Sequence, residues 1–159
     1  MTGKPAMVDI SGKPAVLREA VAEGLIRLKP ETVKRVRKGL IAKGDPLNVA
    51  TVMATLAAKE TPKIVALCHP IPVTGVKVSY QFPDDFTIKV SAEVKAYAQT
   101  GVEMEALTAA AVALLNIWDM AKPYEKDEEG QYPHTQISSI RVVKKIKKAK
   151  PKPRRVEKS

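Results

Sequence analysis

The sequence predicts an α+β domain of ferredoxin-like arrangement, in which an antiparallel sheet has its helices packed on one face. A chain of 159 residues suits one domain with its own core, and a composition of 45% apolar and 28% charged residues is typical of globular proteins. Residues 73–82 and 86–94 alternate apolar and polar side chains around a PDD turn, which predicts a hairpin. Helical segments lie on both sides of this hairpin, and a strand segment lies near each end of the chain.

The first half of the chain supplies one strand and two helices. Residues 17–28 mix apolar and charged side chains without clear alternation, and we predict a strand there. Residues 30–40 begin with a proline and have Gly39 after the last turn, a pattern typical of a short helix. The KGDP segment then breaks the chain. Asp45 can cap a second helix, which we expect to run over 46–59 from a proline in its first turn.

The second half adds the strongest helical signal and a last strand. Residues 101–122 are rich in alanine and leucine, and neither proline nor a further glycine interrupts them. Pro123 follows directly, so the helix is expected to end behind Lys122. Residues 136–145 supply a final strand. The predicted order is therefore strand, helix, helix, strand, strand, helix, strand.

Composition indicates the kind of core and the compartment. Only 4% of the residues are aromatic, so we expect an aliphatic core. Cys68 is the single cysteine and no intrachain disulfide can form, which fits a reducing cytoplasm. The N-terminus has no apolar run of signal-peptide type, and the longest apolar stretch, residues 106–118, is too short to span a membrane. We therefore expect a cytoplasmic protein with no membrane partner.

The net charge of +10 is unevenly distributed along the chain. Residues 144–159 hold nine basic residues and one acidic residue, whereas residues 1–143 are close to neutral. We predict one folded domain over 1–143 and a basic, disordered tail over 144–159. The tail could bind nucleic acid through its phosphates, but it has no aromatic residue for stacking and contains no known DNA or RNA module. Nucleic acid is therefore not the expected partner.

The long helix carries charged residues that need an explanation. At about 100° per residue, one stripe roughly 100° wide contains Glu105, Thr108, Val112, Leu115, Asp119 and Lys122. A helix that is apolar nearly all round is buried, so these charges are expected to be buried or at an interface. Two interpretations of Asp119 and Lys122 stay open, namely a functional pair and a structural ion pair between positions i and i+3.

The length of this helix adds a constraint. Glu105 and Asp119 are 14 residues apart, so their α-carbons lie about 21 Å apart along the axis. The two ends are too far apart to contact one small ligand within a single subunit. An antiparallel copy of the helix in a two-fold dimer would bring the acidic end of one chain to the Asp119 end of the other. We favour that arrangement.

Several residues suit a phosphorylated purine or pterin. Glu103 and Glu105 lie in the first turns of the helix, where the dipole favours carboxylates and where they could also accept the paired N–H groups of a guanine-type ring. Lys43 lies in a tight loop before a helix start, which suits a phosphate, although a solvated lysine is the alternative. Neighbouring Cys68 and His69 point to opposite faces of an extended segment, so a catalytic dyad is disfavoured.

Six segments together resemble the MoaC family of molybdenum cofactor biosynthesis. They are MVDISGKP at 7–14, KGDP at 43–46, AAK at 57–59, LCHP at 67–70, TGVEMEALTA at 100–109 and WDMAK at 118–122. The resemblance covers about residues 7–143 and implies a lyase that converts 3′,8-cyclo-7,8-dihydroguanosine 5′-triphosphate into cyclic pyranopterin monophosphate, with release of diphosphate. It also implies hexamers built as trimers of dimers, with active sites at the dimer interfaces.

The resemblance also assigns roles to residues. Asp119 and Lys122 are implied to be the catalytic pair, in which Asp119 shuttles protons during the ring rearrangement with a pKa tuned by burial and by Lys122. Lys43 is implied to hold the phosphates and to offset charge as diphosphate leaves. The implied base and sugar pocket contains Leu67, Cys68, His69, Met104 and Glu105, with Glu103 as a companion. The sequence contains no metal-ligand cluster, so no resident cofactor is expected, although the diphosphate could recruit Mg²⁺.

Three departures from the family pattern affect substrate binding rather than the catalytic pair. The helix after KGDP lacks an arginine near its start, a contact that Arg18 or Lys63 could replace. The segment before TGVEMEAL reads AYAQ, so another basic contact is missing. Pro123 stands directly behind Lys122. Two alternative functions remain, namely a nucleic-acid-associated protein acting through its tail and a ligand-binding assembly protein without activity.

Overall fold

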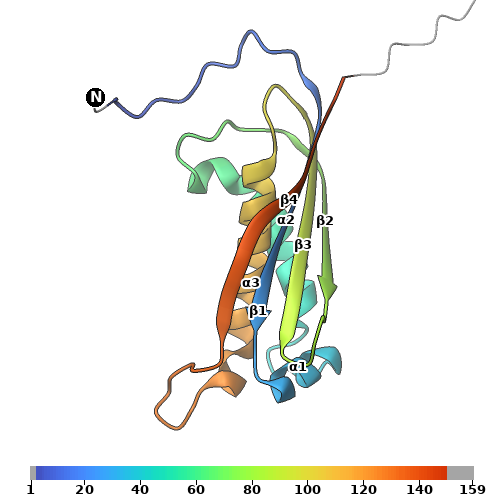
Figure 1. Ribbon diagram of the computed structural model, residues 1–159, viewed down its shortest axis with the longest axis vertical. Helices are drawn as coiled ribbons and strands as arrows, with labels where there is room; N and C mark the ends of the chain where they lie inside the picture. The colour runs from blue at the N-terminus through green and yellow to red at the C-terminus, as the bar shows by residue number, and fades with distance from the viewer. Residues whose placement is uncertain (1–2, 150–159) are drawn as a thin grey trace, which may run out of the picture.

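The computed structural model describes residues 3–149 and contains a four-stranded antiparallel sheet with strand order β2-β3-β1-β4. Two helices, α2 and α3, cover one face of the sheet, while the short α1 lies at one end (Figure 1). The elements are β1 (Val16–Arg27), α1 (Pro30–Arg37), α2 (Pro46–Ile64), β2 (Val73–Gln81), β3 (Thr87–Ala98), α3 (Glu103–Glu125) and β4 (Gln136–Lys148). The predicted class, element order and helix placement are confirmed.

Strand β1 is one of the two inner strands of the sheet, and its positions alternate between buried and half-buried as far as Ile26. Between the buried Val16 and Ile26, the core face carries only Arg18 and the small residues Ala20, Ala22 and Gly24, while apolar residues such as Val21 lie on the opposite face. The alternation is therefore one of burial and not of hydropathy, which explains why the sequence does not display it.

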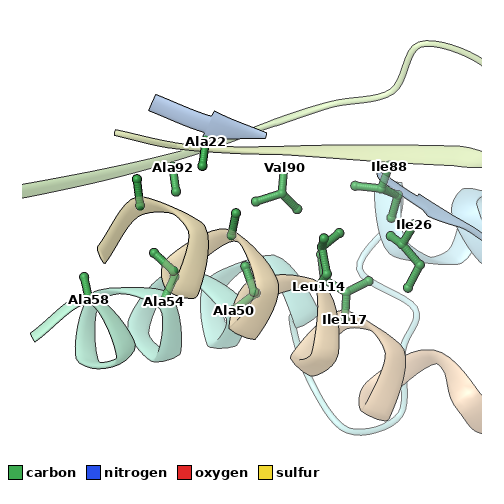
Figure 2. Packing of buried hydrophobic residues seen from close by; sticks show 14 of the residues in the cluster. Ala22, Ile26, Ala50, Ala54, Ala58, Ile88, Val90, Ala92, Leu114 and Ile117 are labelled. Atoms are coloured by element: carbon green, nitrogen blue, oxygen red, sulfur yellow. The ribbon is translucent and has the colours of Figure 1, made fainter. Parts of the chain in front are cut away.

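The core between sheet and helices is aliphatic and rich in alanine, as expected from the composition. Figure 2 shows Ala50, Ala54 and Ala58 of α2 beside α3 and below Ala22 and Ala92 of the sheet. Small side chains allow backbones to approach closely, so the helices lie tightly on the sheet and on each other. This packing fixes the position of α3, whose two ends carry most of the candidate functional residues.

Gly24 of β1 lies where the sheet and α3 approach each other closely. A Cβ atom added to Gly24 would lie 2.6 Å from Leu114 Cδ1 and 3.0 Å from Ile140 Cγ1. Gly24→Ala is therefore expected to lower the free energy of unfolding by about 1–3 kcal/mol, the usual effect of overpacking a core. Urea unfolding measures this change. Gly12→Ala, where the added atom meets nothing within 4 Å, is the control, and equal stabilities of the two variants would contradict the packing described.

Both long helices contain a proline and continue past it. Helix α2 runs five residues beyond the predicted end, through Pro62, and the carbonyl of Ala58 that loses its backbone donor accepts from Thr61 Oγ1 at 3.1 Å. The expectation that Pro123 ends α3 is wrong, because the helix continues to Glu125. The buried Glu125 carboxylate accepts from the Lys29 amide at 3.0 and 3.1 Å and from Thr135 Oγ1 at 2.6 Å, and these bonds hold the last turn.

The last strand is also longer than expected. Strand β4 runs to Lys148 and pairs with β1 as far as Leu17, so residues 144–148 of the predicted tail belong to the sheet. Residues 150–159 of the predicted tail lie outside the described residues. The pairing of β4 with β1 contains a bulge, in which Ser139 and Ile140 of β4 lie opposite Gly24. Ser139 has a φ of 55°. The bulge directs Ile140 against Gly24.

Helix α3 is long and apolar enough, by length and composition, to cross a membrane. Half of its most apolar window is nevertheless buried inside the protein, where it packs on α2, β1 and β3. α3 is therefore the core helix of this domain, and its apolar composition is explained by its place between the sheet and α2.

Candidate active site

Three of the predicted residues meet at the C-terminal half of α3. Lys43, in the loop between α1 and α2, places its Nζ 2.8 Å from Asp119 Oδ2 and 3.2 Å from the Asp119 carbonyl oxygen. Lys122, one turn further along α3, places its Nζ 2.7 Å from Asp119 Oδ1. The i, i+3 ion pair considered from the sequence is therefore present, and Lys43 adds a second ammonium to it.

The environment of this cluster differs from the expectation of burial. The side chains of Lys43, Asp119 and Lys122 are 45%, 54% and 41% exposed. Hydrogen bonds from Lys122 and then from Lys43 lower the pKa of Asp119 to about 2, and the hydrogen bond to Asp119 raises the pKa of Lys122. Within one chain the two lysines, and not burial, therefore set the pKa of Asp119, so the expected contribution of Lys122 is present and that of burial is not. The cluster carries a net positive charge at neutral pH and suits a phosphate.

A second group of predicted residues meets at the opposite end of α3. A pocket of about 630 Å³ is lined by Leu67, Cys68, His69, Glu103 and Met104. The remaining wall contains residues that the sequence did not single out as site residues: Ala6, Val8, Ile10, Lys13, Thr100, Gly101 and Lys145. The pocket therefore joins the N-terminal segment, the LCHP loop, the start of α3 and the end of β4.

Glu105 is a buried carboxylate beside this pocket. It is 1% exposed, and its Oε1 accepts from Cys68 Sγ at 3.7 Å, while Oε2 has no hydrogen-bond partner among residues 3–149. Burial raises the pKa of Glu105, and burial together with the Glu105 charge raises the pKa of the Cys68 thiol. A thiol with a raised pKa is a poor nucleophile, so Cys68 fits the wall of a binding pocket better than covalent catalysis.

Glu103 has a different environment from Glu105. Lys145 forms an ion pair with its carboxylate. Partial burial acts to raise the pKa of Glu103, but the hydrogen bond from Lys145, with the charge of Arg18, lowers it overall. The Arg18 side chain is buried and donates to the carbonyls of Ala98 at 3.3 Å and Gln99 at 3.0 Å. Arg18 thus fixes the turn before α3, and this engagement argues against the suggested phosphate contact.

Two other predicted positions are also engaged. His69 Nε2 donates to the Val8 carbonyl at 2.7 Å and fastens the N-terminal segment over the pocket. Lys63, the other suggested substitute for a phosphate contact, pairs with Glu60 and is exposed. His134 lies exposed in the loop before β4. Within residues 3–149, no group of three or more His, Cys, Asp or Glu side chains could hold a metal ion.

The structure therefore brings the predicted residues together as two groups, not one. The base-pocket group lies at the start of α3 and the Lys43–Asp119–Lys122 group near its end, with about 21 Å of helix between Glu105 and Asp119. Beside the second group, Trp118 and Tyr132 pack their rings with centroids 5.8 Å apart, and these two residues line a shallow hollow with Asp119 and Lys122.

Comparison with known proteins places this arrangement in a family. The model of the MoaC family matches residues 7–148. A probable cyclic pyranopterin monophosphate synthase of Pyrococcus abyssi is 55% identical over 141 residues, 89% of this chain and 88% of the relative. Proteins with the same description from Sulfolobus acidocaldarius (56%, covering 89% of this chain and 98% of the relative) and Methanoregula boonei (53%, covering 91% and 93%) match similarly. The chain belongs to the MoaC family.

Proposed function

We infer that this chain is a cyclic pyranopterin monophosphate synthase, a lyase of molybdenum cofactor biosynthesis, as its relatives are described. Its substrate is 3′,8-cyclo-7,8-dihydroguanosine 5′-triphosphate, and its products are cyclic pyranopterin monophosphate and diphosphate. The observation that carries this inference is the cluster of Lys43, Asp119 and Lys122, which presents two ammonium groups around one ionised carboxylate.

The charges of the cluster favour a division of roles. Two lysines can bind phosphate oxygens and offset the charge of the departing diphosphate. Asp119, with a pKa of about 2, is a carboxylate at neutral pH that holds both ammonium groups in place. Lys122, whose pKa is raised by Asp119, stays protonated beside the phosphates, and we propose that it also donates the proton during the ring rearrangement. This scheme needs no resident metal ion, and Mg²⁺ would enter only with the phosphates. We place the reaction in the cytoplasm, where the free Cys68 stays reduced.

The pocket at the start of α3 complements this cluster. Glu103 lines this pocket and is kept ionised by Lys145, whereas Glu105 lies buried behind Cys68, where burial raises its pKa. A guanine-derived ring presents both donors and acceptors on its edge. We assign Leu67, Cys68, His69, Glu103, Met104 and Glu105 to binding the base and sugar.

We propose that one complete site combines the two groups from different protomers. The helix separates them by too great a distance for one chain to hold a nucleotide between them. Apolar residues are exposed along the outer face of α2 at helical spacing, namely Val49, Val52, Met53 and Leu56, and Leu115 of α3 is 59% exposed. Such a stripe favours association with a second copy. The hexamer, as a trimer of dimers, is proposed from the family resemblance.

An assay of diphosphate release tests the proposed function and also separates it from the alternatives. The full chain and a chain ending at Ala149 are both expected to release diphosphate from the cyclic dihydroguanosine triphosphate at the same rate. A protein acting through its tail would instead bind DNA or RNA with a steep salt dependence and lose this binding on truncation. Substrate binding without diphosphate release would identify a ligand-binding protein and overturn the proposal.

A further inference from the structure

The loop that carries Lys43 is attached to α3 at two consecutive positions. The amide of Ala42 donates to the Tyr124 hydroxyl at 2.9 Å. The ammonium of Lys43 donates to the carbonyl of Asp119 at 3.2 Å, in addition to its bond with the carboxylate. The two acceptors near the end of α3 are therefore a backbone carbonyl and a phenol hydroxyl. Whether they are available to the loop depends on Pro123 and Tyr124, the two residues that follow Lys122.

Pro123 leaves the Asp119 carbonyl without its usual donor. In an α-helix this carbonyl would accept the amide of residue 123, four positions later, but proline has no N–H. The proline ring also crowds the carbonyl four residues before it and turns it away from the helix axis. Since α3 continues to Glu125, the oxygen stays within an intact helix and is open to a donor from outside. Lys43 is that donor.

Tyr124 provides the second attachment and is itself held in place. The guanidinium of Arg35 lies 5.0 Å from the centre of its ring, which brings α1 against α3. The Lys29 ammonium donates to the Tyr124 carbonyl at 3.5 Å. On the far side of Lys43, the Asp45 carboxylate caps α2 by accepting from the amides of Leu47 at 2.9 Å and Asn48 at 3.2 Å. The loop is thus fixed on both sides of Lys43.

We propose that Pro123 and Tyr124 are positioning residues for Lys43, one by leaving a helix carbonyl free for its ammonium and the other by holding the amide just before it. The inference rests on the proposed function of Lys43 as a phosphate-binding group. It assigns a purpose to the proline that departs from the family pattern. In this chain the helix gives up one internal hydrogen bond, and the lysine gains a fixed position beside Asp119.

Tyr124→Phe and Pro123→Ala, in the full chain, test the proposal. The first removes the acceptor of the Ala42 amide, and the second restores a backbone donor to the Asp119 carbonyl. The pKa of Asp119, measured by NMR of its carboxyl carbon, is expected to rise from about 2 in both variants, because Lys43 is one of the two ammonium groups that lower it. The ammonium of Lys122 is present in both variants and continues to lower the Asp119 pKa. Tyr132 is the other titratable group that acts on the pKa of Lys122. KM for the triphosphate is expected to increase about tenfold, the factor for one hydrogen bond to a charged group.

Pro62→Ala is the matched control, since it replaces the proline inside the other long helix, α2, and restores a backbone donor there. It is expected to change neither the Asp119 pKa nor KM, whereas Pro123→Ala should change both while raising the melting temperature. An unchanged Asp119 pKa and KM in Tyr124→Phe and Pro123→Ala would overturn the proposal. If no variant and no wild-type sample turns the substrate over but the Asp119 pKa still rises, the positioning of Lys43 is supported and the proposed function fails.

Discussion

Lys122→Ala is expected to lower the rate of diphosphate release roughly 10²–10⁴-fold, the usual contribution of a positioned acid or base. The ammonium of Lys122 lies 2.7 Å from Asp119 Oδ1 and is the main group that lowers the Asp119 pKa. Its loss removes the proposed proton donor and one of the two cations proposed to bind the phosphates. Since the side chain is 41% exposed and no core contact is lost, the fold should persist. Steady-state assays of diphosphate measure the effect.

Lys126→Ala provides the control for this experiment. Lys126 is an exposed residue four positions further along, just past the end of α3. Its replacement removes the same charge from the same end of the molecule and is expected to change the rate less than twofold, the size of a surface substitution. A Lys122→Ala variant that retains the wild-type rate would exclude Lys122 from the chemistry.

Much of the fold could be predicted because the hairpin and the long helix carry strong periodic signals. Strand β1 could not be recognised by alternation, because the middle of its buried face consists of the small residues Ala20, Ala22 and Gly24. Gly24 is buried where Leu114 and Ile140 leave no room for a side chain. The residue type at such a position is determined by how closely the neighbouring side chains approach the backbone, and hydropathy does not measure this distance.

The ends of helices and strands were predicted less well, because tertiary contacts decide where they lie. A proline signals a helix end in an isolated segment, but Glu125 and its three bonds to Lys29 and Thr135 hold α3 together beyond Pro123. Lysines 144–148 suggested a solvated tail, yet their backbone pairs with β1. Ile146, placed within the lysine run, is the sequence signal that the strand continues. Long-range pairing therefore overrides local composition at both places.

The candidate site was predictable in its residue types and in its division along α3. The rise of an α-helix alone separates Glu105 from Asp119. The ion pair of Lys145 with Glu103 and the anchoring of the turn before α3 by Arg18 depend on the register of β4 and β1, which the sequence does not display. The exposure of Asp119 also required the structure, since a nearly all-apolar helix suggested burial.

The proposed sharing of one site between two protomers leads to the second large effect, the restoration of activity by mixing inactive subunits. His69→Ala alters the base pocket, and Lys122→Ala alters the lysine cluster at the other end of α3. Each variant alone is expected to be at least about tenfold slower than wild type. In a two-fold dimer of the two variants, one site collects both substitutions and the other collects none. Random pairing then places intact sites at about one quarter of all positions.

Co-expression of the two variants with different tags, which show that mixed oligomers form, followed by assay of the unfractionated mixture, measures this directly. A mixture of Lys122→Ala with Asp119→Ala is the control, since both substitutions affect the same end and no pairing can build an intact site. The account predicts that mixing His69→Ala with Lys122→Ala restores about one quarter of wild-type diphosphate release in a random mixture. Mixed oligomers that form but stay as slow as either variant would contradict a site shared between protomers.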